Sequence, residues 1–253
     1  MKISSISDVH IKVQGDMPYQ LIKKFFNHRE VQTSDIVILN GDIFDILIGG
    51  KAQYLNKYED FFLSVKELTK RGIKVLYIEG NHDFHIQKVV SKAVQKFGID
   101  KDLFTHIKNK ICIEAPYGNI LFTHGDDIEI ENSSYQNYKR KINNPFVKFL
   151  GDYIVPFKFI EWIGHRESNK SRGKNEKQYE LSIEGQEFVK EKFRKSADIF
   201  FEKNTDVAGL VCGHSHCKDL YQIENKYYIN NGYAPKSNSF ILVSEKGPEF
   251  IDL

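Results

Sequence analysis

Short apolar runs alternate with longer amphipathic stretches over the first hundred residues. Residues 36–39 and 73–78 are mainly apolar runs of strand length, and residues 3–7 also predict a strand. Between them, residues 21–28 and 54–70 place apolar side chains at helical spacing, and the second stretch ends in Arg-Gly, a typical helix C-terminus. Strands that alternate with helices favour βαβ units, so the sequence predicts an α/β fold with a parallel sheet.

The pattern changes after residue 131. Residues 111–113 and 120–123 predict a hairpin, after which strand signals are missing until residue 207. The stretch between them has helical periodicity over residues 135–150, 153–164 and about 176–202, and the chain ends in strand-like segments. We therefore expect a core of residues 1–131 and 207–253, interrupted by a helical insertion, the cap, at residues 132–206.

Composition excludes several classes of protein. With 253 residues and 41% hydrophobic content, the chain has enough apolar side chains for one α/β domain with an insertion. The net charge of +2 argues against a general nucleic-acid binder, although residues 139–177 carry ten Lys/Arg against four Asp/Glu. The chain has neither Gly-x-Gly-x-x-Gly nor Gly-x-x-x-x-Gly-Lys-Ser/Thr, so a nucleotide cofactor or NTPase activity is disfavoured.

The cysteines and the first strand predict a cytosolic protein. There are three cysteines, an odd number without Cys-x-x-Cys spacing, which is typical of thiols in a reducing compartment. The first apolar strand starts at Ile3, which leaves no room for a signal peptide before it, and no apolar run reaches the length of a membrane span. Any membrane contact is expected to be peripheral.

Metal-ligand side chains follow five of the predicted strands. The carboxyl ends of strands are where open α/β sheets build their sites, and Gly41 allows the sharp turn that brings Asp42 there. Taken singly, each residue has a structural alternative, such as an N-cap or a turn. A single zinc site needs only three or four ligands, so the surplus predicts two divalent ions with Asp42 between them. The candidate ligands are Asp8, His10, Asp42, Asn81, His124, His214 and His216.

The tetrapeptide Gly80-Asn81-His82-Asp83 adds candidate catalytic residues. Asn81 offers an amide oxygen as a neutral ligand, and the adjacent His82 points elsewhere and acts on substrate. Asp83 is expected to orient the His82 ring. The alternative is a simple turn, because Asn, Gly and Asp are all common turn residues.

The predicted insertion is rich in aromatic and basic residues. Residues 146–163 interleave phenylalanine, tyrosine and tryptophan with lysine, and residues 168–177 are polar and basic. The apolar side chains either pack the insertion on the core, or form an acyl-chain pocket or an interfacial face. The basic stretch is either a solvated loop or a phosphate-contacting one.

Five motifs together resemble those of the calcineurin-like metallophosphoesterases. They are Asp8-x-His10, Gly41-Asp42-x-x-Asp45, Gly80-Asn81-His82-Asp83, His124 and Gly213-His214-x-His216. The resemblance implies a four-layer α/β/β/α sandwich with two Mn, Fe or Zn ions. It implies that one ion is held by Asp8, His10 and His216, the other by Asn81, His124 and His214, and that Asp42 is shared. His82 would contact the phosphoryl oxygens or the leaving group.

A narrower resemblance concerns the substrate. The chain resembles the bacterial UDP-2,3-diacylglucosamine hydrolases of lipid A synthesis in its length, in the position of its insertion and in the segment around Tyr135. That resemblance implies hydrolysis of the pyrophosphate to UMP and 2,3-diacylglucosamine 1-phosphate, with Mn²⁺, at the cytosolic face of the inner membrane. It implies an insertion that caps the site and binds the acyl chains. The implied substrate-binding residues are Asn81, His82, Tyr135 and His214.

One position departs from that narrower family. Many of these hydrolases carry arginine where this chain has His82. A histidine can neutralise phosphate charge and can also protonate a poorer leaving group. The alternative is therefore a phosphodiesterase or phosphatase that acts on nucleotides or phosphoproteins. A non-catalytic scaffold on the same fold is disfavoured, because such proteins lose ligands and none is missing here.

Overall fold

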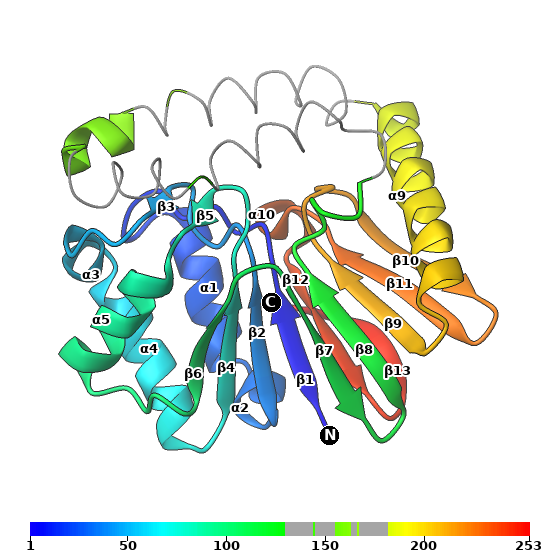
Figure 1. Ribbon diagram of the computed structural model, residues 1–253, viewed down its shortest axis with the longest axis horizontal. Helices are drawn as coiled ribbons and strands as arrows, with labels where there is room; N and C mark the ends of the chain where they lie inside the picture. The colour runs from blue at the N-terminus through cyan, green and yellow to red at the C-terminus, as the bar shows by residue number, and fades with distance from the viewer. Residues whose placement is uncertain (130–143, 145–154, 163–165, 167–181) are drawn as a thin grey trace.

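The computed structural model describes residues 1–129, 144, 155–162, 166 and 182–253. Two β-sheets face each other at its centre (Figure 1). The first sheet has six strands in the order β13-β12-β1-β2-β4-β6, the second has five in the order β10-β11-β9-β8-β7, and β3 and β5 form a small third sheet.

The first sheet comprises β1 (Ile3–Ile6), β2 (Ile36–Asn40), β4 (Lys74–Ile78), β6 (Phe104–Ile107), β12 (Ser239–Ser244) and β13 (Gly247–Asp252). The other strands are β3 (Leu47–Ile48), β5 (Asp83–Phe84), β7 (Lys110–Ala115), β8 (Gly118–Thr123), β9 (Val207–Cys212), β10 (Lys218–Ile223) and β11 (Lys226–Asn231).

The first sheet is parallel through β1, β2, β4 and β6. Its register pairs Ile38 with Ser5 on one side and with Leu76 on the other. The strands β12 and β13 extend it in antiparallel orientation. The predicted α/β class with a parallel sheet is confirmed.

The described helices are α1 (Met17–Asn27), α2 (Arg29–Gln32), α3 (Gln53–Lys57), α4 (Glu59–Lys70), α5 (Gln87–Phe97), α9 (Ile183–Lys203) and α10 (Ala234–Ser237).

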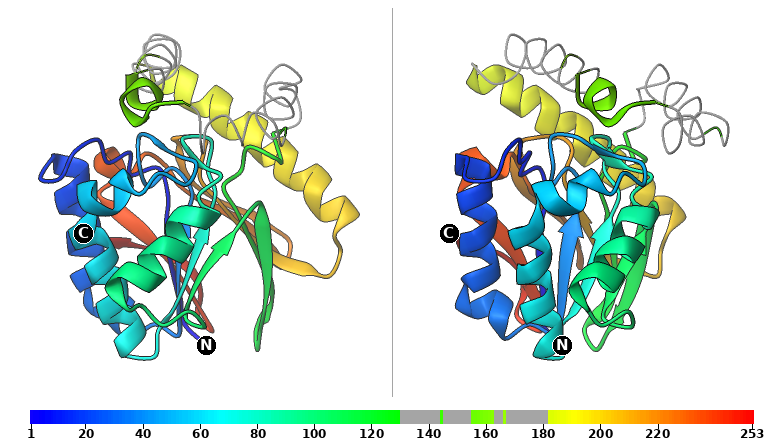
Figure 2. Two further views of the ribbon diagram at one scale, coloured as in Figure 1. Left: turned by 60° about the vertical axis from the view of Figure 1, so that its left-hand side comes forward. Right: turned by 90° about the vertical axis from the view of Figure 1, so that its left-hand side faces the viewer.

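Three hydrophobic clusters separate four layers of secondary structure. Alternation along β2 sends Val37 and Leu39 towards α1, α4 and α5, and sends Ile38 between the two sheets. On the far side of the second sheet, Phe193 and other apolar residues of α9 pack with Leu210. Figure 2 shows the helices on the two outer sides of the sheets. The α/β/β/α sandwich implied by the family resemblance is therefore confirmed.

Helix α9 lies inside the range expected for the insertion, but it forms the fourth layer of the sandwich. Ser182 caps its N-terminus by accepting a hydrogen bond from the Gly185 amide. Residues 157–162 are also helical. Except for residue 144, the predicted helix at 135–150, with Tyr135, lies outside the described residues. So do residues 153–154 and 163–164 of the next predicted helix. In the part of the chain that is described, no helix is both long enough and apolar enough to cross a bilayer.

Two features differ from the sequence prediction. The helix expected over residues 54–70 is broken at Tyr58, whose φ of −124° and ψ of 34° interrupt it. The Tyr58 ring packs on Phe44 with ring centroids 4.2 Å apart, so tertiary contact outweighs local helical preference. The second feature is α5 and β6, which add an α/β unit that the sequence reading left unassigned.

Candidate metal centre

The candidate ligands meet at one edge of the sandwich. They follow the carboxyl ends of β1, β2, β4, β8 and β9, which all lie at the upper edge in Figure 1. Asn40, the last residue of β2, donates from its side chain to the Thr123 carbonyl oxygen at 2.9 Å. This buried hydrogen bond ties the first sheet to the second directly beneath the site.

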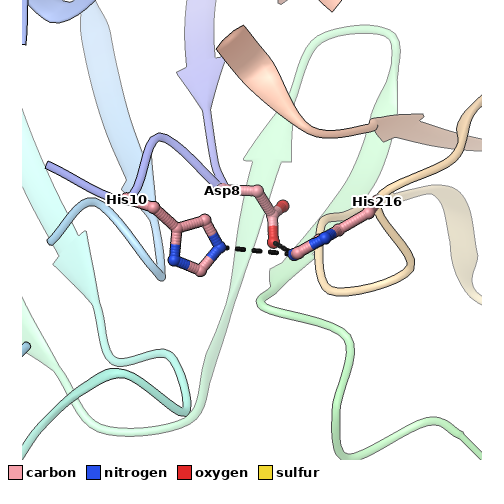
Figure 3. A group of neighbouring side chains, drawn as sticks. All are labelled: Asp8, His10 and His216. Carbon is pink, nitrogen blue, oxygen red and sulfur yellow. Dashed lines mark hydrogen bonds and ion pairs between the residues drawn. The ribbon is translucent and has the colours of Figure 1, made fainter. Parts of the chain in front are cut away.

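Asp8, His10 and His216 form the first group (Figure 3). The Nε2 atoms of His10 and His216 lie 3.3 Å apart, and His216 Nε2 lies 3.3 Å from the Asp8 carboxylate. Asp8 and His10 are buried. Two ring nitrogens and a carboxylate oxygen thus converge on one point, although 206 residues separate His10 from His216.

Asn81, His124 and His214 form a second group. The Asn81 Oδ1 atom lies 3.0 Å from His124 Nε2 and 2.9 Å from His214 Nδ1. On its other side, the His124 ring places Nδ1 3.1 Å from the Asn40 carbonyl oxygen. A carbonyl oxygen only accepts, so this contact assigns the proton to Nδ1 and leaves Nε2 to face Asn81.

Asp42 lies between the two groups. Its Oδ2 atom is 3.5 Å from His124 Nε2 and 3.8 Å from His10 Nε2, one nitrogen from each group. Its other oxygen, Oδ1, accepts a hydrogen bond of 2.8 Å from the His82 amide. The structure therefore brings together all seven predicted ligands, with the carboxylate of Asp42 in the central place.

Backbone conformation explains how short segments present so many ligands. Asp8, His10, Asp42, His214 and His216 all have φ between 53° and 67°, in the left-handed region. This conformation is costly for non-glycine residues and is concentrated at functional sites. Side chains two residues apart share one face of an extended segment, but Asp8 and His10 are not extended. Their shared site comes instead from left-handed turns after β1.

Two glycines permit close approach at the site. At Gly41, φ is +82° and a Cβ atom would lie 2.6 Å from His124 Nδ1. At Gly80, a Cβ atom would lie 2.2 Å from the Asp42 carboxylate. Both distances are far below van der Waals contact, so only glycine fits. The turn that the sequence predicted at Gly41 is confirmed.

The charges at the centre depend on one another. Burial raises the pKa of Asp42, but the charges of His124, His82 and His10 outweigh burial and hold it well below its usual range. Burial lowers the pKa of His124, but the Asp42 carboxylate raises it to about 10. A positive charge next to Asp42 is therefore strongly favoured, as expected of a site for cations.

The Asp83 carboxylate is bonded to the backbone of the Asp42 loop. It accepts hydrogen bonds from the Asp42 amide at 2.9 Å, the Ile43 amide at 2.7 Å and the Gly80 amide at 2.8 Å. The Tyr77 hydroxyl donates to it at 2.7 Å. Asp83 therefore holds the backbone beneath the site, whereas it was expected to orient the His82 ring. That ring has its Nδ1 atom 2.9 Å from the Asp45 carbonyl oxygen.

The sequence analysis gave no role to Asp45 and Tyr233. Asp45 is buried, with Oδ1 3.8 Å from His10 Nδ1. Tyr233 stacks on His216 with ring centroids 5.5 Å apart. The Gly-Asp-x-x-Asp spacing contained the signal for Asp45. Tyr233 carried no local signal, because it reaches the site only through the pairing of β11 with β9.

The donor atoms fit divalent metal ions. Carboxylate oxygen, amide oxygen and imidazole nitrogen suit Mn, Fe and Zn. His10 and His216 face each other through their Nε2 atoms, so at least one of these nitrogens lacks a proton. When both lack a proton, the two lone pairs can bind one cation.

Comparison with known proteins agrees with this geometry. The profile of the calcineurin-like phosphoesterase family matches residues 1–218. The chain belongs to this family. As a calcineurin-like phosphoesterase, it is a metal-dependent phosphoester hydrolase, because the family uses divalent metals and the clustered Asp and His residues can bind them.

Several curated relatives of this phosphoesterase carry the same name. It is 26% identical over 223 residues to the UDP-2,3-diacylglucosamine hydrolase of Photobacterium profundum, covering 87% of this chain and 82% of the relative. It is 24% identical over 222 residues to the enzyme of that name from Yersinia pestis, covering 87% and 83%. Among solved structures, it is similar to an archaeal phosphodiesterase, with a TM-score of 0.48 and 14% identity over the whole of both chains.

Proposed function

We propose that this phosphoesterase hydrolyses the pyrophosphate of UDP-2,3-diacylglucosamine, giving UMP and 2,3-diacylglucosamine 1-phosphate. The observation that carries the proposal is the similarity to hydrolases of that name over 87% of the chain. The arrangement of Asp8, His10, His124 and His216 around Asp42 supports it. The proposed setting is the cytoplasm, at the cytosolic face of the inner membrane, without a nucleic-acid partner.

We assign two divalent ions to the site, most simply Mn²⁺. Asp8, His10 and His216 would hold one, Asn81, His124 and His214 the other, and the central Asp42 carboxylate would be shared. When bound, such ions supply positive charge that orients a phosphoryl group and activates water. Asn81 and His214 border that charge and are proposed to contact the substrate.

His82 has the contacts of a residue that faces the substrate. Its Nδ1 atom donates to the Asp45 carbonyl oxygen, which fixes the ring and keeps a proton on Nδ1. Its ring lies edge-on to His10 with centroids 4.8 Å apart, next to the first ligand group. The remaining nitrogen, Nε2, is proposed to bind a phosphoryl oxygen or the leaving oxygen. Asp83 contributes indirectly, because it holds the backbone of Asp42 and Ile43.

The proposed acyl-chain and membrane contacts rest on residues of the insertion. Phe159 and Trp162 stack with centroids 5.7 Å apart, and they are 49% and 55% exposed. Arg166 lies over the Trp162 ring at 5.6 Å. Exposed aromatics beside a cation suit an anionic lipid interface. Tyr135 is proposed as a further substrate contact within the insertion.

Substrate comparison tests the proposal. The purified protein with Mn²⁺ is expected to release UMP from UDP-2,3-diacylglucosamine and to hydrolyse the deacylated UDP-glucosamine far more slowly. Asp42→Ala serves as the inactive control. Failure to cleave the acylated substrate with Mn²⁺, Fe²⁺ or Zn²⁺ would refute the substrate assignment.

A second candidate function is a phosphodiesterase or phosphatase for nucleotides or phosphoproteins. The identity of residue 82 favours it, because a histidine can donate a proton to a leaving group that is a poor anion. Equal rates on acylated and deacylated substrates, together with turnover of simple phosphodiesters, would support this candidate over the first.

A further inference from the structure

Glu129 lies just before the insertion and contacts a ligand of the candidate metal centre. Its Oε2 atom is 3.4 Å from His214 Nε2, and its Oε1 atom is 2.6 Å from Lys192 Nζ. The Glu129 side chain is only 11% exposed. A largely buried carboxylate thus lies between a candidate metal ligand and a lysine of α9.

The two nitrogens of His214 face different partners. Nδ1 lies 2.9 Å from Asn81 Oδ1, on the side of the second ligand group. Nε2 faces the Glu129 carboxylate on the opposite side. An ionised carboxylate can only accept a hydrogen bond, so Glu129 favours a proton on Nε2. The Asn81 oxygen also only accepts, so the two contacts compete for the ring proton of a neutral His214. A metal ion bound to Nδ1 and Asn81 Oδ1 would require the proton to be on Nε2, the nitrogen that faces Glu129.

Two buried histidines of the site, His10 and His124, are oriented in a comparable way. His124 directs Nε2 to the site and Nδ1 to the Asn40 carbonyl oxygen at 3.1 Å. His10 directs Nε2 to the site, and its Nδ1 lies 3.8 Å from the Asp45 carboxylate. Histidines that bind metals commonly donate their second N–H group to a carboxylate or carbonyl, which fixes the ring and raises its basicity.

We propose that Glu129 is a positioning residue that sets the His214 tautomer for metal binding, and that Lys192 holds Glu129 in place. This inference rests on the proposed metal site and assigns an outer contact that the motifs do not contain. Phe193, the neighbour of Lys192, lies edge-on to the His214 ring with centroids 6.3 Å apart. Helix α9 therefore contacts His214 directly through Phe193 and indirectly through Lys192 and Glu129.

Metal titration of the full chain tests the proposal. Loss of an outer-shell partner weakens metal binding by about 10–100-fold. We expect Glu129→Ala to weaken one of the two Mn²⁺-binding steps by this factor in calorimetric titration of the metal-free protein. Glu129→Gln should weaken it less, because the amide oxygen still accepts from Nε2. Lys192→Met should have a smaller effect than Glu129→Ala.

Glu187→Gln is the matched control. Glu187 pairs with Lys190 at 2.6 Å on the exposed side of the same helix, so this variant should bind Mn²⁺ like the wild type. Thermal melting establishes that each variant is folded. Wild-type Mn²⁺ affinity at both steps in folded Glu129→Ala would overturn the proposal.

A readout independent of metal separates this inference from the proposed function. Nitrogen-15 NMR of histidine rings in the metal-free protein should show the His214 proton shared between Nε2 and Nδ1, with a larger population on Nδ1 in Glu129→Ala than in the wild type. The same distribution of the proton in the wild type and in Glu129→Ala would overturn the inference, whatever the substrate. Failure of the wild type to cleave the lipid substrate would leave the tautomer result unaffected.

Discussion

The Nδ1 atom of His82 lies 2.9 Å from the main-chain oxygen of Asp45. The carbonyl can only accept, so this contact keeps a proton on Nδ1 and leaves Nε2 as the atom through which the ring would act on a substrate. In the neutral ring Nε2 is an acceptor, and it donates only after protonation. The backbone of the Gly-Asp-x-x-Asp motif thus sets the chemistry of the histidine in the next motif.

The first prediction concerns His82→Ala. Because His82 contacts ligands without being one, we expect the variant to retain metal while its kcat falls by about 10²–10⁴-fold, the usual contribution of a general acid or base. Metal content by atomic emission and initial rates measure the two effects separately. A loss of metal as large as that in Asp42→Ala would contradict this role.

Asp42→Ala removes the carboxylate between the two ligand groups. Its oxygen lies 3.5 Å from His124 and 3.8 Å from His10, so both groups lose their shared anion. We expect both metal occupancy and turnover to be abolished. Full occupancy of either group in this variant, measured by metal analysis after dialysis, would show that Asp42 is not shared.

The third prediction concerns the pH dependence of the metal-free protein. The Asp42 carboxylate raises the pKa of His124 to about 10, from 6.5 in the unfolded chain. Between pH 6.5 and pH 10 the native state therefore binds one more proton than the unfolded state. The stabilisation of the native state by this proton is complete below pH 6.5 and is lost as the pH rises to 10. Thermal melts across this range should show decreasing stability in the metal-free wild type and a flatter profile in His124→Asn.

The same proton competes with metal. A ligand histidine must be neutral, so metal binding releases the His124 proton and Mn²⁺ affinity should increase by about tenfold per pH unit below the raised pKa. Calorimetric titration in buffers of different ionisation enthalpy measures the released proton. Affinity that does not change with pH would contradict the pairing of His124 with Asp42.

The fourth prediction concerns Asp83→Asn. Burial raises the pKa of Asp83 to about 7, and the nearby Asp42 charge acts in the same direction. At alkaline pH the ionised carboxylate accepts bonds from the backbone at Asp42, Ile43 and Gly80, and each buried donor left unsatisfied costs about 1–3 kcal/mol. We expect a large loss of unfolding free energy and a lower metal content.

Two variants calibrate that result. Tyr77→Phe removes only the hydroxyl bond to Asp83 and should cost about 1.5–3 kcal/mol, less than Asp83→Asn. Asp60→Asn weakens a comparable tyrosine contact, at 3.1 Å from Tyr19 and away from the site, and should leave metal content unchanged. Equal metal content in the Asp83 and Asp60 variants would show that Asp83 does not position the Asp42 loop.

The sequence by itself determined the α/β class and the list of candidate ligands. Apolar runs that end in Asp8, Asp42, Asn81, His124 or His214 predict strands whose carboxyl ends carry ligands. Because the carboxyl ends of parallel strands share one edge of a sheet, sequence order alone was enough to predict a common site.

Only the tertiary structure decided how the ligands combine. The contact of His10 with His216 spans 206 residues and depends on how the two sheets pack, which no local pattern encodes. The left-handed backbone at Asp8 and His10, the bonds of Asp83 to the Asp42 loop, and the approach of α9 to His214 are likewise set by long-range contacts. Local propensity governs which elements form, whereas close packing of distant segments governs which side chains meet.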